Sequence, residues 1–361
     1  MSHAVSERLN RKFASLFTTG LLQWNKHINK REMPWKGEKD PYKIWLSEII
    51  LQQTRVEQGL KYYLRFIETY PTIAALARAP EQEVFKLWEG LGYYSRCKNL
   101  ILTAKEICNL HEGIFPVRHE TIRQLKGIGD YTAAAIASFA YDEPHAVVDG
   151  NVLRVLSRIF DLHEPIDATT GKKRFSDIAQ QLLPRKRAAE FNQAIMDFGA
   201  IICRPMPCCT DCFFQKHCQA FLNGTAPNLP VKQKKTLVRD RYFNYIVLQH
   251  QERFALQQRT GEDIWQNLFH FPLVETTKHM SSTVVLHKFM KLQKLAESSL
   301  QQLQTSVLSK QRLSHQLIHF QFIKAALHTT TVAGDYLWIT ASELKLYPLP
   351  KGLQTYVQQH F

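Results

Sequence analysis

Leu125-Lys126-Gly127-Ile128-Gly129-Asp130-Tyr131-Thr132 is the stretch that decides the fold of the first part of the chain. It lies between two segments of helical periodicity, the second running from Thr132 to Ala140. Gly127 and Gly129 let the backbone come close to a ligand, and the N–H groups at the start of the next helix attract a phosphate. With Lys126 beside them, we interpret the stretch as a helix-hairpin-helix that holds a DNA backbone without reading its sequence. An ordinary corner between two helices is the alternative.

The composition indicates a basic protein large enough for two domains. The chain has 361 residues, of which 45% are hydrophobic and 22% charged, so it can bury sizeable cores and does not resemble a disordered chain. Its formal net charge of +14 favours a polyanionic partner, either nucleic acid or an anionic membrane surface. No apolar run reaches the ~18 residues that span a bilayer. Residues 1–10 lack the apolar core of a signal peptide. We therefore expect a cytoplasmic protein that does not enter membranes.

The pattern of the chain changes after the cysteine-rich segment. Residues 1–222 show the three- and four-residue spacing of helices, which predicts an all-α first domain. Residues 223–241 combine Gly, Pro and basic side chains and are interpreted as a linker. Residues 242–361 mix strand-like and helical segments and predict an α+β second domain. Within it we expect strands at Tyr242–Leu248 and Phe254–Gln258 and a helix at Met290–Leu303.

A predicted helix carries the first candidate catalytic residue, Glu48. Asp40-Pro41 is a typical helix start, and the helix is expected to continue to Thr54. Glu48 shares a face with apolar neighbours such as Trp45 and Leu51. Loss of solvation raises the pKa of a carboxyl group, which keeps a Glu protonated as a general acid near neutral pH. The alternative is a Glu that points to solvent or pairs with a basic residue.

A second carboxyl group follows in the stretch Ala146–Val155. Here an apolar segment leads to Asp149, then Gly150 and Asn151, and a new helix. Asp149 or Asn151 is a candidate N-cap of that helix. Asp149 is also a candidate for a carboxylate facing Glu48, because cleavage of a glycosidic bond commonly uses two carboxyl groups.

Five of the seven cysteines lie close together, in the pattern Cys203-x5-Cys209-x2-Cys212-x5-Cys218 with Cys208 in addition. In a reducing compartment such a cluster indicates a metal site rather than disulfides. Four thiolates bind either zinc or an iron–sulfur cluster, and the spacing alone leaves both open.

These segments together resemble the MutY-type adenine DNA glycosylases, a helix-hairpin-helix family with a [4Fe–4S] cluster. The resemblance covers nearly the whole chain. The matching segments of the first domain are Arg31–Trp35, Trp45–Thr54, Gly90–Arg96, Val148–Val152 and Phe191–Gly199.

The resemblance implies a role for each matched residue. Glu48 takes the position of the general acid and Asp149 that of the second catalytic carboxylate, with Tyr131 and Asn151 beside them. Cys203, Cys209, Cys212 and Cys218 would hold the [4Fe–4S] cluster. The first gap is one residue shorter than usual, so Cys208 could replace Cys209. Tyr93 would wedge into the duplex. The remaining substrate- and DNA-binding residues of the first domain are Arg31, Met33, Trp35, Leu51, Gln53, Thr54, Lys126, Gly127, Gly129 and Asp197.

The second domain resembles the MutT-like (NUDIX-fold) domain with which the family reads 8-oxoguanine. Trp265–Pro272 and Leu344–Pro350 match two of its segments, and Ser314 and His315 match the loop that reaches the oxidised base, with Leu313 where Phe is usual. The resemblance implies a monofunctional glycosylase of base excision repair that acts as a monomer in the nucleoid. Its substrate would be double-stranded DNA in which adenine is mispaired with 8-oxoguanine or guanine.

Three other functions fit the residues less well. An endonuclease III-like lyase carries a Lys where this chain has Tyr131, and that Lys forms the Schiff base. A NUDIX hydrolase needs an Arg- and Glu-rich helix that is missing after Pro272. A structural DNA-binding protein has no need for Glu48 and Asp149 together.

Overall fold

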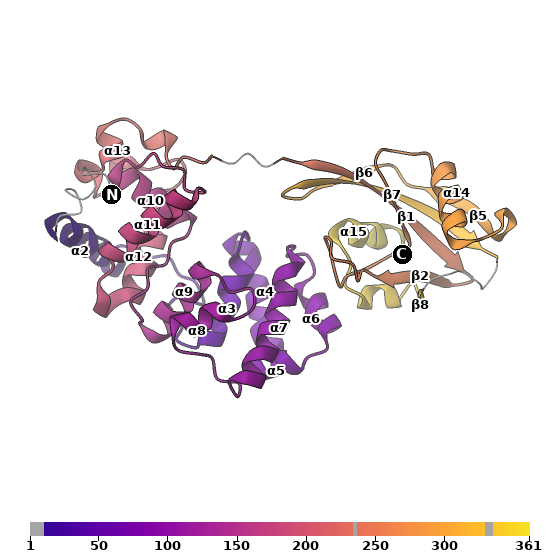
Figure 1. The fold of residues 1–361 in the computed structure, drawn as a ribbon, viewed down its shortest axis with the longest axis horizontal. Helices are drawn as coiled ribbons and strands as arrows, with labels where there is room; N and C mark the ends of the chain where they lie inside the picture. The colour runs from indigo at the N-terminus through magenta and orange to yellow at the C-terminus, as the bar shows by residue number, and fades with distance from the viewer. Residues whose placement is uncertain (1–10, 234–236, 329–334) are drawn as a thin grey trace. The chain divides into compact units, whose positions relative to one another are not determined.

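The computed structural model describes residues 11–233, 237–328 and 335–361, so the expectation for residues 1–10 lies outside the described part (Figure 1). Two compact units are formed. The first combines Met1–Ala77 with Leu102–Lys234, and the second combines Arg78–Ile101 with Lys235–Phe361. No helix among the described residues has the length and apolar character needed to cross a membrane.

Helices make up most of the chain before residue 222, which comprises the first unit and the Arg78–Ile101 part of the second. The α-helices between residues 11 and 222 are α2 (Arg11–His27), α3 (Pro41–Leu51), α4 (Val56–Thr69), α5 (Ile73–Arg78), α6 (Glu81–Trp88), α7 (Tyr94–Leu110), α8 (His119–Gln124), α9 (Asp130–Tyr141), α10 (Gly150–Phe160), α11 (Thr169–Leu182), α12 (Ala188–Ile201) and α13 (Gln219–Leu222). Short 3-10 turns are η1 (Arg185–Arg187), η2 (Cys209–Asp211), η3 (Gln215–His217) and η4 (Ala226–Asn228).

The helix that carries Glu48 starts as expected but ends earlier. The Asp40 carboxylate accepts a hydrogen bond from the Tyr42 N–H at 2.9 Å, and Pro41 occupies the first turn of α3. The helix stops at Leu51 instead of continuing to Thr54, because Gln53 takes a left-handed backbone with φ of 55°. The predicted C-terminal end of this helix is therefore wrong.

The predicted hairpin lies between α8 and α9, and the predicted helix Thr132–Ala140 is confirmed within α9. Gly127 has a φ of 74°, which a residue with a side chain rarely adopts and which turns the chain between the two helices. Leu125 and Ile128 are buried and anchor the turn, whereas Lys126 is exposed. The small residues of α9 allow it to pack closely against α3.

A core of large apolar side chains joins α2, α10, α11 and α12. Aromatic rings of three elements meet there, since Phe17 of α2 stacks on Phe214 at 4.8 Å and contacts Phe191 of α12 edge-on. This packing fixes α12 against α10, and the two helices bring Asp149 and Asp197 into one region of the unit.

The second unit contains the mixed sheet expected for residues 242–361. Its strands are β1 (Arg239–His250), β2 (Arg253–Gln258), β3 (Phe269–His270), β4 (Leu273–Thr276), β5 (Leu300–Thr305), β6 (Ser309–Arg312), β7 (Gln316–Leu327) and β8 (Leu337–Thr340). Its helical elements after β1 are α14 (Ser282–Gln293), η5 (Glu297–Ser299), η6 (Glu343–Leu346) and α15 (Lys351–His360).

The sheet is built around two long parallel strands, β1 and β7, which pair with Tyr245 opposite Phe322. The strand order is β3-β2-β1-β7-β5, with β4 on β1, β6 on β7 and β8 on β2. Side chains alternate between the two faces, so Ile323 packs against α14 and Phe322 stacks on Tyr356 of α15 at 4.0 Å. The two helices therefore cover opposite faces of the sheet.

Three details of the second unit can be compared with the sequence predictions. The predicted strands Tyr242–Leu248 and Phe254–Gln258 are confirmed within β1 and β2. The predicted helix Met290–Leu303 is confirmed only for Met290–Gln293, the end of α14, and is wrong beyond it: Lys294 caps α14 with a left-handed φ of 53°, and Leu300–Thr305 pairs with β7 as a strand. β1 begins at Arg239, inside the segment that we interpreted as a linker.

Candidate active site

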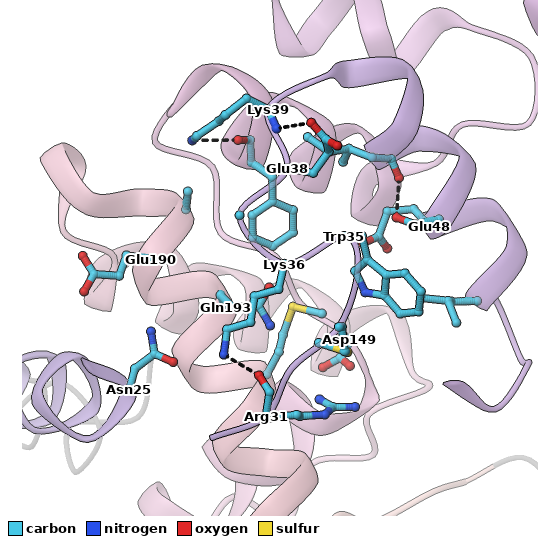
Figure 2. Close-up of a pocket in the computed structure, with 18 of the residues that line it drawn as sticks. Asn25, Arg31, Trp35, Lys36, Glu38, Lys39, Glu48, Asp149, Glu190 and Gln193 are labelled. Carbon is cyan, nitrogen blue, oxygen red and sulfur yellow. Dashed lines mark hydrogen bonds between the residues drawn. The ribbon is translucent and has the colours of Figure 1, made fainter. Parts of the chain in front are cut away.

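The largest concentration of predicted site residues lines a cavity of about 550 Å³ in the first unit (Figure 2). Its walls come from the segment between α2 and α3, from α3 and α9, from the start of α10 and from α12. A cavity of this size has the dimensions of a small-molecule site. The predicted residues that line it are Arg31, Met33, Trp35, Glu48, Leu51, Thr54, Tyr131, Asp149 and Asn151.

Glu48 lies in this wall with only 8% of its surface exposed. Burial raises the pKa of its carboxyl group from the ordinary 4.5 to about 7, and the charge of Asp149 acts in the same direction. The Tyr131 hydroxyl opposes this shift, because it donates a hydrogen bond of 2.7 Å to Glu48 Oε2. The prediction that burial raises the pKa of Glu48 is confirmed, and Glu48 and Asp149 interact electrostatically.

Asp149 is both the N-cap of α10 and a pocket residue, so the two alternatives for it do not exclude each other. Its Oδ1 accepts the Val152 N–H at 2.7 Å, and its Oδ2 accepts the Asn151 side-chain amide at 2.6 Å. Burial raises the pKa of the Asp149 carboxyl group, and the hydrogen bonds from Val152 and Asn151 act against that rise. The cap thus fixes the orientation of a carboxyl group that faces the cavity.

A chain of hydrogen bonds runs from Asp149 to the cysteine segment. Asn151 Oδ1 accepts a bond of 2.8 Å from the Arg154 guanidinium, which also donates to the Cys203 carbonyl at 2.8 Å. α12 approaches so closely that a Cβ on Gly199 would lie 2.8 Å from the Cβ of Asn151. Glycine is therefore required where α12 crosses the start of α10.

Asp197, predicted near the pocket, lies behind its wall and is fully buried. Its carboxylate binds Arg31 at 2.8 Å and Lys36 at 3.1 Å, and it accepts a hydrogen bond of 2.8 Å from Asn29. Arg31 and Lys36 both line the cavity. A buried carboxylate with these partners anchors the segment between α2 and α3 rather than touching a ligand itself.

Several predicted binding residues of the first unit lie outside the cavity. Lys126, Gly127 and Gly129 are exposed together at the α8–α9 hairpin. The Thr103 hydroxyl donates to the Lys126 carbonyl at 2.5 Å and Glu106 accepts from the Lys126 N–H, whereas no atom lies within 4 Å of the place that a Cβ on Gly129 would take. Gln53 is exposed beyond the end of α3 and holds a positive φ, a conformation that is concentrated at functional positions.

The cysteines of the predicted metal site surround one small cavity, and none of the described cysteines forms a disulfide. Burial raises the pKa of Cys212 to about 12 and of Cys218 to about 11, and the charges of Cys203 and Cys209 contribute to both shifts. Arg158 donates to Cys203 Sγ at 3.5 Å. Among the described residues no three His, Cys, Asp or Glu side chains are close enough to hold a single metal ion.

Cys208 differs from its neighbours in its contacts. Its Sγ accepts a hydrogen bond of 2.9 Å from Arg204. The charge of Cys208 raises the pKa of Cys209, whereas the cysteines that raise the pKa of both Cys212 and Cys218 are Cys203 and Cys209.

The second unit brings Tyr93 and Ser314 together. The Tyr93 hydroxyl and Ser314 Oγ are hydrogen-bonded at 2.7 Å, and both line a cavity of about 510 Å³ with His315. Ser314 and His315 form the exposed turn between β6 and β7. Tyr93 has a φ of 48°, a strained backbone for an aromatic residue.

Four functional candidates were not predicted from the sequence: Lys36, Lys186, Gln193 and Arg154. The first three line the main cavity, and Arg154 connects Asn151 to Cys203. For Gln193 a signal exists, because it lies four residues before Asp197 on one face of α12. Lys36 lies in the loop between α2 and α3, Lys186 in the basic turn η1 and Arg154 on α10. For these three, residue type alone does not separate a functional side chain from a solvated one.

The chain matches two family models. Residues 46–182 match the HhH-GPD superfamily of base excision DNA repair proteins, and residues 244–359 match the NUDIX domain. The fold and the site therefore define a helix-hairpin-helix base excision repair protein with a NUDIX domain.

Curated relatives narrow this class. An adenine DNA glycosylase of Buchnera aphidicola (subsp. Baizongia pistaciae) is 36% identical over 71% of this chain and 73% of its own length. An adenine DNA glycosylase of Homo sapiens is 39% identical over 56% of this chain and 39% of its own length. The chain belongs to the MutY-type adenine DNA glycosylase family.

Solved structures agree with the helical fold. A thermostable thymine-DNA glycosylase superposes with a TM-score of 0.54 at 29% identity, over 59% of this chain and 98% of the other. An endonuclease III, solved in a non-covalent complex with DNA, gives a TM-score of 0.51 at 18% identity, over 58% and 97% of the two chains, and shows the fold alone.

Proposed function

We propose that this protein is a monofunctional adenine DNA glycosylase of base excision repair, which hydrolyses the N-glycosidic bond of adenine mispaired with 8-oxoguanine or guanine. The observation that carries the proposal is the pair of interacting carboxyl groups in one cavity, one of them with a pKa of about 7. An acid of that pKa is partly protonated at neutral pH and can serve as a proton donor. Membership of the adenine DNA glycosylase family supports adenine as the base.

In the mechanism that we propose, adenine leaves the duplex and enters the cavity. The Glu48 carboxyl group donates its proton to N7 of the base, the C1′–N9 bond breaks, and its electron pair leaves with the neutral adenine. The Asp149 carboxylate stabilises the positive charge that develops on the sugar. Glu48, now ionised, accepts a proton from the water that adds to C1′. Tyr131 and Asn151 hold the two carboxyl groups in place.

The first test is adenine release from a duplex that holds one adenine opposite 8-oxoguanine. We expect release by the native chain and a loss of it in Glu48→Gln, since the amide cannot donate a proton as the acid does. Binding of the same duplex, measured by gel shift, should remain, because Gln preserves the shape of the side chain. Substantial turnover by Glu48→Gln would contradict the assignment of the general acid.

The DNA partner is held, in this proposal, by the exposed Lys126–Gly129 turn and by the residues around the cavity. The turn between β6 and β7, with Ser314 and His315, would contact 8-oxoguanine, and Tyr93 would enter the duplex beside it. The hydrogen bond between Tyr93 and Ser314 supports this pairing of roles. Acting on chromosomal DNA, the protein would work as a monomer in the nucleoid.

We further propose that Cys203, Cys209, Cys212 and Cys218 hold a [4Fe–4S] cluster. The donor set fits, since free thiols surround one cavity and Arg158 approaches Cys203. Cys209 is favoured over Cys208 as the fourth ligand, because Cys203 acts electrostatically on Cys209, and Cys209 in turn acts on Cys212 and Cys218. When bound, such a cluster ties the chain around η2 and η3 into one unit.

Metal analysis tests the cluster. The purified protein should be yellow-brown and contain about four irons per chain. Cys209→Ser should lose iron, whereas Cys208→Ser should keep it. Stoichiometric zinc without iron, or loss of iron in Cys208→Ser alone, would contradict the proposed ligand set.

A further inference from the structure

Five basic side chains line the main cavity, and most of them are already engaged. Their partners lie within the protein: Arg31 and Lys36 bind Asp197, Lys39 donates to the Phe139 carbonyl at 2.9 Å, and Arg187 binds Glu190 through two hydrogen bonds of 2.6 and 2.8 Å. Figure 2 shows Lys36 and Lys39 turned toward backbone carbonyl oxygens, Lys36 toward that of Arg31 and Lys39 toward that of Phe139. These contacts hold the four side chains in place, and two carboxylates, Asp197 and Glu190, offset part of their positive charge.

Lys186 is the exception. It lies in η1, immediately before α12, with Arg185 and Arg187 on either side. Its side chain is exposed and lines the cavity, and in the part of the chain that the structure describes it has no hydrogen bond or ion pair. Two carboxylates share this part of the lining, Asp142 and Glu190, and Glu190 is paired with Arg187. Lys186 therefore presents an unpaired positive charge at the rim.

We propose that Lys186 binds a phosphate that flanks the extruded nucleotide, an inference that rests on the proposed function. An extruded base enters a cavity of this size, but the two phosphates on either side of its sugar remain outside. They carry negative charge to the rim, where a lysine ammonium acts as a point charge with three donors. The contact exists only when the nucleotide is extruded, so it offsets part of the free-energy cost of unstacking and unpairing the base.

The test measures how DNA affinity depends on salt. Each phosphate that a basic side chain neutralises contributes about −0.9 to the slope of log K against log [salt]. Two duplexes are compared, one whose target nucleotide is extruded in the complex and one whose nucleotides stay stacked. One places 2′-fluoro-2′-deoxyadenosine opposite 8-oxoguanine, since the fluorine destabilises the cationic sugar and prevents cleavage. The other places cytosine opposite 8-oxoguanine.

We expect Lys186→Met to reduce the slope by about one unit on the fluoroadenosine duplex and to leave it unchanged on the cytosine duplex. Lys186→Arg should restore the native slope. Lys173→Met is the matched control, because Lys173 is exposed on α11 and does not line the cavity. Lys173→Met should have the same effect on the salt slope of both duplexes.

An unchanged slope in Lys186→Met, or an equal reduction on both duplexes, would overturn the inference. Adenine release by the native chain on the unmodified duplex is measured alongside. If release occurs but the Lys186→Met slope equals that of the native chain, only the inference fails. If the native chain releases no adenine, the proposed function itself fails.

Discussion

Three influences act on the pKa of the Glu48 carboxyl group, two in one direction and one in the other. Burial and the nearby Asp149 favour the protonated form, whereas the hydrogen bond from Tyr131 favours the ionised form. The balance sets its pKa near 7, so both forms are populated at neutral pH. A residue that donates a proton and later accepts one from water needs access to both forms.

Replacing Tyr131 with Phe removes the contact that lowers the pKa of Glu48. The pKa of Glu48 should then rise, and the protonated fraction above pH 7 should increase. The alkaline limb of the pH–rate profile for adenine release should therefore move to higher pH, by on the order of one unit for a hydrogen bond to a charged group. Single-turnover rates between pH 5 and 9 measure this shift.

Tyr141→Phe provides the matched control, since Tyr141 lies on the same helix and donates to the Phe115 carbonyl instead. The alkaline limb of the pH–rate profile of Tyr141→Phe should stay at its native pH. An unmoved limb in Tyr131→Phe, or the same movement in both variants, would show that the Tyr131 hydroxyl does not control the protonation of Glu48.

At the scale of elements, α10 begins at a residue with two functions. Asp149 satisfies backbone N–H groups at the N-terminus of the helix and presents its carboxyl group to the cavity. Asn and Asp are comparable N-caps, whereas Ala is a poor one. Two substitutions can therefore separate the stability of the helix from its chemistry.

Asp149→Asn should keep the free energy of unfolding close to the native value, and Asp149→Ala should lower it by about 1 kcal/mol. Adenine release should fall on the order of 10²-fold or more in both, because neither side chain offers a negative charge to the sugar. Chemical unfolding and single-turnover assays measure the two effects. Native activity in Asp149→Asn would show that the residue serves only as a cap.

How far the sequence predicts these elements depends on whether the signal is local. The Asp40-Pro41 start, the α9 helix and the apolar face around Glu48 depend on neighbouring residues, and all three are present in the structure. The end of α3 depends on the backbone that Gln53 adopts, and β5 depends on pairing with β7. Long-range contacts of this kind leave no periodic pattern in the segment itself.

The same limit applies to the site. The carboxyl groups could be identified singly from their local contexts, but their meeting in one cavity depends on the packing of α3 and α9 and of α10 against α12. Asp197 was predicted to bind the substrate but does not line the cavity. Its carboxylate is paired with Arg31 and Lys36 behind the cavity wall, and residue type alone does not indicate this.

At the scale of the whole molecule, residues 78–101 belong to the same compact unit as the sheet, although they lie within the helical part of the sequence. Glu89 accepts a hydrogen bond of 2.8 Å from the Leu349 N–H, and Lys98 donates one of 3.0 Å to Gln266. The boundaries at 222 and 242 stay a prediction. A chain ending near Arg241 would lose these contacts together with part of β1, so point substitutions in the full chain test the second unit more cleanly.

Ser314→Ala and His315→Ala should each reduce the preference for adenine opposite 8-oxoguanine over adenine opposite guanine. Oxidation at C8 adds a carbonyl and turns N7 from an acceptor into a donor, and a hydroxyl and an imidazole can bond to both. Each such contact is worth roughly 1–3 kcal/mol, so the ratio of release rates should fall by about 5- to 150-fold. Release opposite guanine should change little, because guanine lacks the atoms that these side chains would contact.

The matched control is Ser309→Ala, because Ser309 is an exposed serine of β6 that lies outside the Tyr93 cavity. This variant should keep the native ratio of release rates. If both Ser314→Ala and His315→Ala also keep it, the turn between β6 and β7 is not the part of the molecule that reads the oxidised base.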